Sequence, residues 1–321
     1  MTSTSSTHRR PPAAAILVVP LLAAVILTLF AWPNARLEPR DLPVAVAGSG
    51  PAAEALAEQL GSQGDRFDVE RAADESAARS AIEDREVYGA FVAGPDGPKV
   101  LVSSAASPLT AQLLTHAAEE QEAPVEDVVP ASPRASALGS SVLPLVLAGI
   151  LTGVAASLLA SSMLGRAGLV ATASILVGLA GAAIVHSWLD VVEGDWWANA
   201  GVLALTVGAI GAVVAGAKSL FGAPGAAITA LTMVFVGNPF SGVATAPELL
   251  PQPVGGLGQL LPPGAGGNLL RSTGFFDGAG AGAPLLVLSC WALAGLAMLA
   301  VAGLRGRAAA ASRSDAVAVA G

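Results

Sequence analysis

The residues that could perform chemistry are few in this chain and are scattered along it. Its three histidines are His8, His116 and His186, and its one cysteine is Cys290. The sequence contains no nucleophile elbow, no zinc-protease motif and no phosphate-binding P-loop. It therefore predicts no catalytic residue, no metal site, no cofactor and no enzymatic activity. A single cysteine also excludes an intrachain disulfide.

One glycine-rich turn has the outline of a phosphate site. Gly48, Ser49 and Gly50 follow an apolar segment and precede a helix-like segment, where backbone amides at a helix N-terminus can hold phosphate. Because Pro51 follows the second glycine, the sequence favours a structural turn between a strand and a helix over a dinucleotide site.

An acidic cluster near the middle of the chain is the other candidate site. It lacks a histidine or cysteine at ligand spacing, so the sequence favours a solvated linker over a metal site. From residue 33 to 142 there are 18 acidic and 8 basic residues, which argues against binding of this region to nucleic acid or anionic lipid. The cluster comprises Glu119, Glu120, Glu122, Glu126 and Asp127.

The elements that surround these residues are mostly apolar. Of 321 residues, 53% are hydrophobic and 12% are charged, against about 25% charged in ordinary soluble domains. Apolar stretches long enough to cross a bilayer occupy residues 13–32, 143–164, 168–189, 200–217, 220–237 and 283–304. Gly222 and Pro224 interrupt the fifth stretch near its start.

The predicted fold is a polytopic α-helical membrane protein with six transmembrane helices. A small α/β extracytoplasmic domain lies between the first and second helices. The predicted divisions are a cytoplasmic tail (1–12), helix one (13–32), the extracytoplasmic domain and linker (33–142), a five-helix membrane domain (143–304) with an outer hairpin (238–282), and a cytoplasmic tail (305–321).

The first span has two interpretations. A basic start and an apolar run are shared by signal peptides and membrane anchors. Its run of about 19 residues exceeds the usual 7–15 residues of a signal peptide, and no A-x-A cleavage pattern follows. The sequence favours a retained anchor.

The charges of the short loops predict the orientation. Cytoplasmic loops collect Lys and Arg, and tryptophans settle at the interface. We therefore expect a plasma membrane protein with both termini in the cytoplasm. The inner set is Arg9, Arg10, Arg166, Lys218, Arg305, Arg307 and Arg313; the outer loops hold Arg271 with Asp190, Glu193, Asp195, Glu248 and Asp277, and Trp188, Trp196 and Trp197.

The residues within the spans also indicate how the helices pack and whether an ion could be bound inside the membrane. The last five carry no Asp, Glu, Lys or Arg in their interiors, so they offer no group for a coupling ion. His186, near an outer end, is expected at the interface instead of in a proton relay. Small residues at helix-packing spacing favour packing within the bundle over a dimer seam. They include Gly149, Gly153, Gly178, Gly181, Gly201, Gly208, Gly211 and Gly216.

The polar region predicts an alternating α/β domain. Strands are expected at 43–47, 67–70, 88–93 and 99–103, with helices at 51–60, 74–86 and from Ser107–Pro108 onward. Residues 94–97 predict a hairpin turn between the last two strands. In the last helix, Leu109, Leu113 and Ala117 form one apolar stripe.

The segment after the fifth span is the most distinctive local feature. Its proline- and glycine-broken apolar pieces are too short to span, and they predict short helices that dip into the outer leaflet. It reads Asn238-Pro239-Phe240-Ser241-Gly242, then Ala246-Pro247-Glu248-Leu249-Leu250-Pro251, then Leu260-Leu261-Pro262-Pro263-Gly264, then Leu269-Leu270-Arg271.

This progression resembles the outer hairpin of type-2 ABC exporter permeases. The order of one span, an outer domain and five spans resembles the branch related to phage-infection-protein-like membrane proteins. The resemblance implies a permease subunit that moves a hydrophobic or envelope substrate, dimerises in the lipid bilayer, and works with a separate ATP-binding subunit. It implies gating by Pro239, Phe240, Pro247, Pro251, Pro262, Pro263 and Arg271, and ATPase-facing loops at Arg166 and Lys218.

The sequence leaves a second function open. In this alternative, the chain is a non-transporting envelope protein whose outer domain binds a partner, such as a secretion-system component or a phage. An embedded enzyme is disfavoured, because no catalytic constellation is present.

Overall fold

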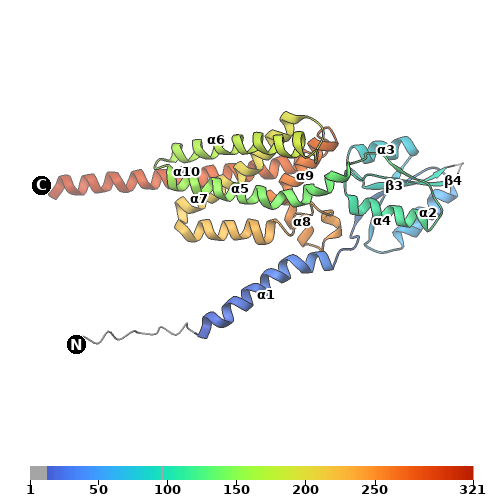
Figure 1. Cartoon of the computed structure of the whole chain (residues 1–321), viewed down its shortest axis with the longest axis horizontal. Helices are drawn as coiled ribbons and strands as arrows, with labels where there is room; N and C mark the ends of the chain where they lie inside the picture. The colour runs from blue at the N-terminus through green and yellow to red at the C-terminus, as the bar shows by residue number, and fades with distance from the viewer. Residues whose placement is uncertain (1–12, 95–96, 321) are drawn as a thin grey trace.

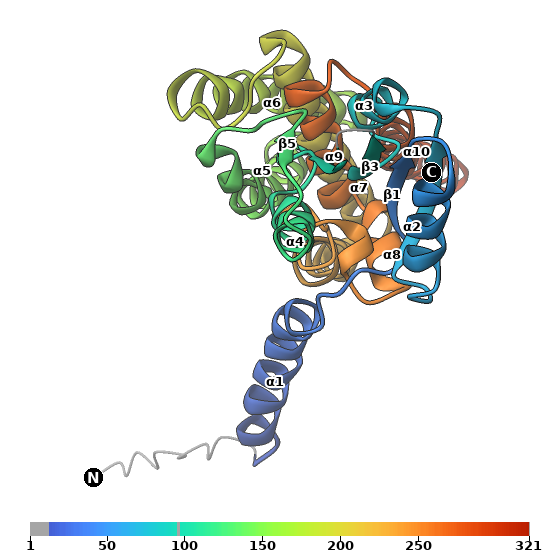
Figure 2. The same cartoon turned by 90° about the vertical axis from the view of Figure 1, so that its right-hand side faces the viewer.

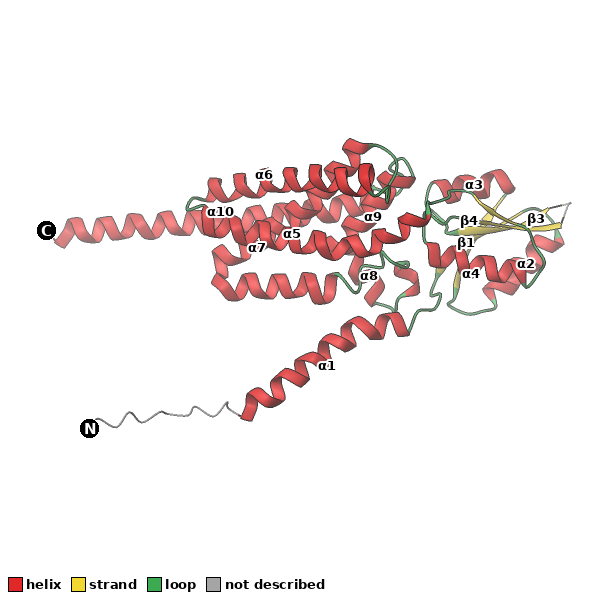
Figure 3. Ribbon diagram, in the orientation of Figure 1, coloured by secondary structure: helices red, strands yellow, loops and turns green. Residues whose placement is uncertain are grey.

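A computed structural model describes residues 13–94 and 97–320 of the chain. Helices dominate it, and the strands gather in one domain at one end of a helical bundle (Figures 1 and 3). The predicted tail 1–12, with Arg9 and Arg10, lies outside the described residues, as do Pro95 and Asp96 of the predicted turn.

Five helices of the described chain are long and apolar enough to cross a membrane. They cover Leu17–Ala35, Pro133–Leu159, Met163–Trp188, Trp196–Gly237 and Gly282–Ser312. The membrane-protein class is therefore supported, although six spans were expected. The difference lies in the two predicted spans between residues 200 and 237, which both fall within the single stretch Trp196–Gly237.

That stretch is bent at the predicted interruption. Helix α7 (Trp196–Thr232) contains Gly222 with φ 73° and ψ −159°, a non-helical conformation that suits glycine. A Cβ on Gly225 would lie only 2.6 Å from the carbonyl oxygen of Ala217. Eight residues of straight helix would separate such positions by about 12 Å. The chain therefore folds back on itself at Gly222.

The bundle is built around the first half of α7. Helices α5 (Leu138–Leu159), α6 (Met163–Ala182) and α10 (Gly282–Ala320) all pack against it. Two short π-helical segments, η2 (Ala183–Trp188) and η3 (Met233–Gly237), extend α6 and α7.

Glycines bring these helices close together. A Cβ on Gly153 would lie 2.5 Å from the oxygen of Gly211, and one on Gly178 would lie 2.5 Å from the oxygen of Ala200. Gly216 meets Gly295 of α10 in the same way, at 2.6 Å. The predicted packing within the bundle is confirmed at these positions, where no larger residue fits without a backbone shift.

Helix α1 (Ala13–Ala35) stands apart from this bundle (Figures 1 and 2). Its apolar side chains are largely exposed, for example Leu17 at 73% and Leu27 at 68%. Phe30 touches η3 through an edge-to-face contact with Phe235, with ring centroids 6.4 Å apart. An apolar helix this exposed suits a lipid environment.

The α/β domain holds a five-stranded sheet in the order β2-β1-β3-β4-β5. Its strands are β1 (Leu42–Ala47), β2 (Phe67–Ala72), β3 (Gly89–Gly94), β4 (Gly97–Val102) and β5 (Val125–Asp127). All neighbours are parallel except β3 and β4, which form the predicted antiparallel hairpin. Helices α2 (Pro51–Gly61), α3 (Glu75–Glu83) and α4 (Pro108–Glu119) connect the strands.

Local sequence determined the helix starts in this domain. Asp74 accepts a hydrogen bond from Ala77 N, and Ser107 accepts one from Thr110 N, so both residues are N-caps. The predicted stripe of α4 was wrong, because Leu113 is 41% exposed while Ala111, Leu114 and Ala118 are buried against the sheet.

The acidic segment is also more ordered than a solvated linker. Its last two carboxylates lie on the edge strand β5, which pairs with β4. Glu126 bonds Arg79 at 2.7 Å and also pairs with Lys99, while Asp127 accepts hydrogen bonds from Ser104. The linker interpretation fails for these two residues, because three residues of strand place them opposite basic and hydroxyl groups.

Candidate functional site

The segment between α7 and α10 is the one for which the sequence predicted an outer hairpin, and we keep that name for it. It contains the one-turn 3-10 helix η4 (Pro247–Leu249) and helices α8 (Val254–Gln259) and α9 (Pro262–Phe275). Pro247 and Pro262 stand at the first positions of η4 and α9, where a missing N–H costs nothing. The carbonyl of Pro251 accepts bonds from Val254 N and Gly255 N at the start of α8.

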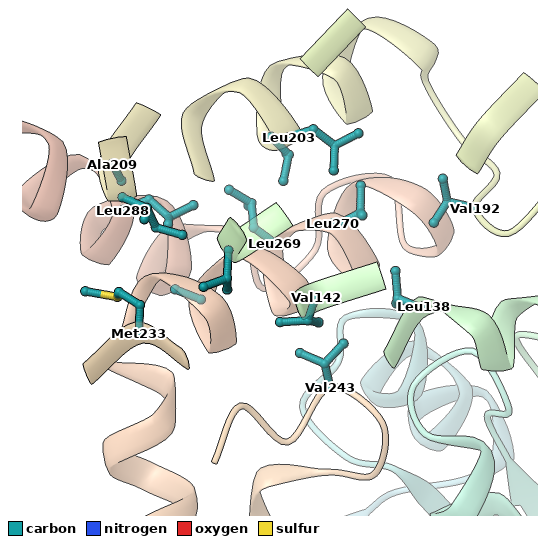
Figure 4. Close-up of a cluster of buried hydrophobic side chains, with 14 of the residues drawn as sticks. Leu138, Val142, Val192, Leu203, Ala209, Met233, Val243, Leu269, Leu270 and Leu288 are labelled. Atoms are coloured by element: carbon teal, nitrogen blue, oxygen red, sulfur yellow. The ribbon is translucent and has the colours of Figure 1, made fainter. Parts of the chain in front are cut away.

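Helix α9 is inserted deeply among the other helices. It packs against α5, α7, α10 and η3. In Figure 4, Leu269 and Leu270 of α9 lie among Val142 of α5, Leu203 of α7 and Leu288 of α10. Burial of this apolar core fixes α9 at the end of the bundle that faces the α/β domain (Figure 1).

Small residues allow this close insertion. A Cβ on Gly266 would lie 2.5 Å from the Thr206 side chain of α7, and one on Gly267 would lie 2.2 Å from Val243. Gly237 approaches Pro263 at 2.7 Å by the same measure. The short helices of the hairpin are therefore tightly packed, and Phe240 is buried among them.

The α/β domain bonds directly to this hairpin. The Tyr88 hydroxyl donates to Glu248 Oε2 at 2.7 Å, and Arg85 Nη2 donates to Asn268 Oδ1 at 2.6 Å. Arg85 Nη1 also donates to the Asn268 carbonyl at 3.3 Å. We call Arg85, Tyr88, Glu248 and Asn268 the junction cluster. A cavity of about 200 Å³ lies beside it.

Backbone and apolar contacts extend the junction. The amides of Glu38 and Arg40 donate to Leu249 O and Glu248 O at 3.1 and 3.0 Å. Phe276, just after α9, packs with Ala105 and Ala106 of the domain, and the Arg85 guanidinium lies 5.2 Å from the centre of its ring. The domain thus holds the hairpin through η4 and through both Asn268 and Phe276.

The electrostatics of the junction favour a neutral tyrosine. Burial raises the pKa of Tyr88 well above its ordinary value, and the negative charge of Glu248 and the hydrogen bond to it raise that pKa further. The positive charges of Arg271 and then Arg85 oppose this shift but do not cancel it. Tyr88 is therefore a hydrogen-bond donor at this interface over the physiological pH range.

Arg271 lies beneath the junction and is buried. Its Nη2 donates to Val243 O at 2.8 Å, and its Nε has no partner among the described residues. The side chain ties α9 to the loop that precedes η4. Within the hairpin, Asn268 Nδ2 donates to Gln259 Oε1 at 3.2 Å, and Gln259 Nε2 donates to Ser241 O at 2.6 Å.

A second polar network links α9 to the helix ends nearby. Buried Asn199 of α7 accepts from Thr273 Oγ1 at 2.7 Å, and its amide nitrogen lies 3.2 Å from His186 Nδ1. His186 therefore contacts α7 near the start of that helix and lies at the same end of the bundle as the hairpin.

The residues predicted to face an ATPase lie near the other end. Arg166 donates from Nε to Ala160 O at 3.0 Å and from Nη1 to Ser219 Oγ at 2.8 Å, so much of its side chain is engaged within the chain. Lys218 is partly exposed on α7. The described structure brings Arg166 and Arg307 to one cavity but does not bring either to the hairpin.

The junction cluster was not predicted from the sequence. Arg85 and Asn268 are 183 positions apart, and Tyr88 and Glu248 are 160 apart, so no local spacing relates them. The described residues also hold no group of three or more His, Cys, Asp or Glu side chains able to bind a metal ion.

Comparison with known proteins gives no relative for this chain. No family model, no curated protein and no solved structure matches it.

Proposed function

We propose that this chain is an integral membrane permease subunit of the ABC exporter type. It moves a hydrophobic or envelope substrate across the plasma membrane and works with a separate ATPase. The observation that carries the proposal is the position of α9, a short helix inserted among α5, α7 and α10 and bonded directly to the α/β domain. A mobile short helix in that position would open and close an exit.

The topology that goes with this function has six crossings. The reversal at Gly222 supplies the fourth and fifth, and α1 supplies the first. Loop charges support termini and basic residues in the cytoplasm and the α/β domain outside. Arg166 and Arg307 line one cavity, while Asp190 pairs with Arg134 in the linker from the α/β domain, at 3.2 Å.

We propose that α9 is the gate and that the α/β domain controls its position. The junction cluster connects the domain to η4 and α9, so a shift of the domain would be passed to α9 without a long linker. Pro239, Pro247, Pro251, Pro262 and Pro263 fix the breaks between the short pieces, so the hairpin moves as segments instead of unravelling.

Energy for transport would come from outside the spans. The interiors of the last five predicted spans hold no Asp, Glu, Lys or Arg for a coupling ion, so a cytoplasmic ATPase is the proposed source. Six crossings make half of the usual exporter in the resembled family, so we propose a dimer with a second copy or a similar chain. We propose that the partly exposed Lys218 side chain contacts the ATPase, together with the loop at Arg166.

Two measurements test this function. The tagged chain, purified from its native membranes in mild detergent, is expected to be dimeric and to bring down a nucleotide-binding subunit whose ATP hydrolysis it stimulates. Pro251→Ala with Pro262→Ala should reduce transport into vesicles but keep the dimer. A monomer that stimulates no ATPase of the same genome would refute the permease.

Reporter fusions test the orientation separately. A reporter after Leu304 should be active in the cytoplasm, and one inserted near Asp96 should be active outside. The opposite result at either site would overturn the proposed sidedness but would leave the question of transport open.

One observation favours the second candidate function, an outer domain that binds a partner. A cavity of about 680 Å³ lies between α4, β5 and the linker to α5. Polar side chains including Gln112, His116 and Glu119 line it. If the domain retains a specific envelope protein from a detergent extract while no ATPase associates with the full chain, this function replaces the permease.

A further inference from the structure

A second cavity lies at the end of the bundle away from the α/β domain. Its volume is about 390 Å³, within the range of about 300–1,000 Å³ that is usual for small-ligand sites. Four segments form it: the loop between α5 and α6, the start of α6, the region of α7 near Ser219, and the later part of α10. We call it the basal cavity.

Two arginines line the basal cavity and no carboxylate does. Arg166 comes from α6 and Arg307 from α10, with Ser161, Ser162 and Ser219 between them. The Arg307 side chain has no ion pair or hydrogen bond to any described residue, and the Arg166 side chain uses only Nε and Nη1 within the chain. A guanidinium has five N–H donors, so several remain available to a bound group.

No described acidic side chain supplies a counter-charge at this end. The acidic residues of the bundle whose side chains are described are Asp190, Glu193, Asp195, Glu248 and Asp277, all on the side of the α/β domain. The positive charge of the basal cavity is therefore uncompensated by described side chains. An anion with several acceptor oxygens, such as a phosphate ester, matches two guanidinium groups.

The remaining wall of the cavity is apolar. Met163, Leu299 and Ala302 line it. Large apolar side chains lie on the same helix ends with their surfaces exposed, including Leu164 at 74% and Leu304 at 63%. A ligand here would have its charged part against the arginines and an apolar part against this surface, as a lipid does.

From this arrangement, we propose that the basal cavity binds the headgroup of an anionic phospholipid. The phosphate would accept hydrogen bonds from Arg166 and Arg307, and the acyl chains would lie along the exposed leucines. Basic pockets between membrane helices are suited to such headgroups. This inference depends on the bundle lying in a bilayer and does not depend on transport.

The test uses the full chain in a neutral detergent. Dioleoylphosphatidylglycerol, added in mixed micelles, should raise the Tm of the protein saturably, while dioleoylphosphatidylcholine should not. Arg307→Gln should weaken the apparent Kd for phosphatidylglycerol about tenfold, as expected for the loss of one charge-assisted contact. Arg305→Gln is the matched control, because Arg305 lies on the same helix end but does not line the cavity.

The possible outcomes decide the proposal. Loss of binding in Arg307→Gln with retention in Arg305→Gln supports it. Equal weakening by both variants would assign the effect to general basic charge and overturn the site. An equal Tm rise with glycerol 3-phosphate would identify a free phosphate ester as the occupant and overturn the lipid. Arg166→Lys adds a second variant that keeps the charge but changes the donor geometry; it should bind more weakly than the unmodified chain, and unchanged binding would argue against the site.

Discussion

Tyr88 of the α/β domain donates a hydrogen bond to Glu248 of the outer hairpin, with 2.7 Å between the two oxygens and 160 positions between the residues. This bond joins the strand-rich domain to the bundle at η4. Arg85, three residues earlier, makes the companion contact with Asn268 of α9. The domain therefore contacts the hairpin at two of its short helical pieces.

The ionisation of Tyr88 can be measured directly, because it is the only tyrosine in the chain. Tyrosinate absorbance should titrate well above the ordinary pKa of about 10. Glu248→Gln removes a negative charge and should lower that pKa, whereas Glu120→Gln, in the exposed acidic segment, should leave it unchanged. A normal pKa in the unmodified protein would show that Tyr88 is not buried at the junction.

The same shift predicts how stability depends on alkaline pH. The folded-state pKa of Tyr88 is raised, so its contribution is fully present below the unfolded pKa of about 10 and is lost as pH rises through the folded pKa. Thermal melts above pH 10 should therefore lose less stability in Tyr88→Phe than in the unmodified protein.

The pairing of Arg85 with Asn268 predicts energetic coupling between the domain and α9. Arg85→Ala and Asn268→Ala should each lower Tm, and a double-mutant cycle should give a coupling of roughly 0.5–3 kcal/mol. Limited proteolysis should cut the segments that enter and leave the domain faster in both variants. Arg36→Ala, in the exposed segment after α1, is the control; additive effects of the first pair would contradict the contact.

The ion network of the α/β domain predicts acid sensitivity. Arg79 and then Lys99 lower the pKa of Glu126 to about 2, and Lys99 and Arg79 lower that of Glu75. Depressed carboxylate pKa values contribute stability above the unfolded value near 4.5 that is lost as pH falls toward the folded values. Arg79→Gln should flatten the decline in stability between pH 4.5 and 2. A decline as steep as in the parent would rule out the network as its cause. Because these groups are substantially exposed, the effect should shrink in high salt.

The glycine contacts predict which small residues of the bundle are replaceable. Gly216→Ala would place a methyl group 2.6 Å from the oxygen of Gly295, so it should destabilise the protein by about 1–3 kcal/mol. Gly201→Ala, on the same helix α7, meets nothing within 4 Å and should leave Tm unchanged or slightly higher. Equal effects of the two substitutions in detergent melts would contradict the packing.

Patterns confined to neighbouring residues predicted much of this fold. The cap at Ser107, the hairpin of β3 and β4, and the break at Gly222 follow from local chemistry, and all three are confirmed. The cap at Asp74 follows from the same local chemistry but was not predicted. The edge strand β5 was missed because three residues, two of them acidic, carry no strand pattern. It pairs with β4, and Glu126 on it forms ion pairs with Arg79 and Lys99, which lie far away in the sequence. The buried face of α4 was wrong for a related reason, since Leu113 and Leu114 are equally apolar and only the sheet decides between them.

Only the local structure of the candidate site was predicted from the sequence. The prolines of the outer hairpin predicted short helices, and Pro247 and Pro262 begin two of them. Their insertion among α5, α7 and α10, and the bonds to Arg85 and Tyr88, arise from contacts between distant segments. Arg85 and Tyr88 lie in the connection between α3 and β3, and nothing in that local sequence indicates that their partners lie in the segment between α7 and α10.

The separation of α1 from the bundle has a consequence for how freely this chain can vary. α1 is buried over only 6% of its span window, whereas the window of Trp196–Gly237 is 78% buried. Selection on α1 therefore acts on apolar character and length, which many sequences satisfy, while selection on the first half of α7, which is mostly buried as far as Ala217, acts on shape at most positions. Related chains should differ most in their first span and least along the first half of α7, and a foreign apolar helix of equal length that keeps an aromatic residue at position 30 should replace α1 without loss of fold.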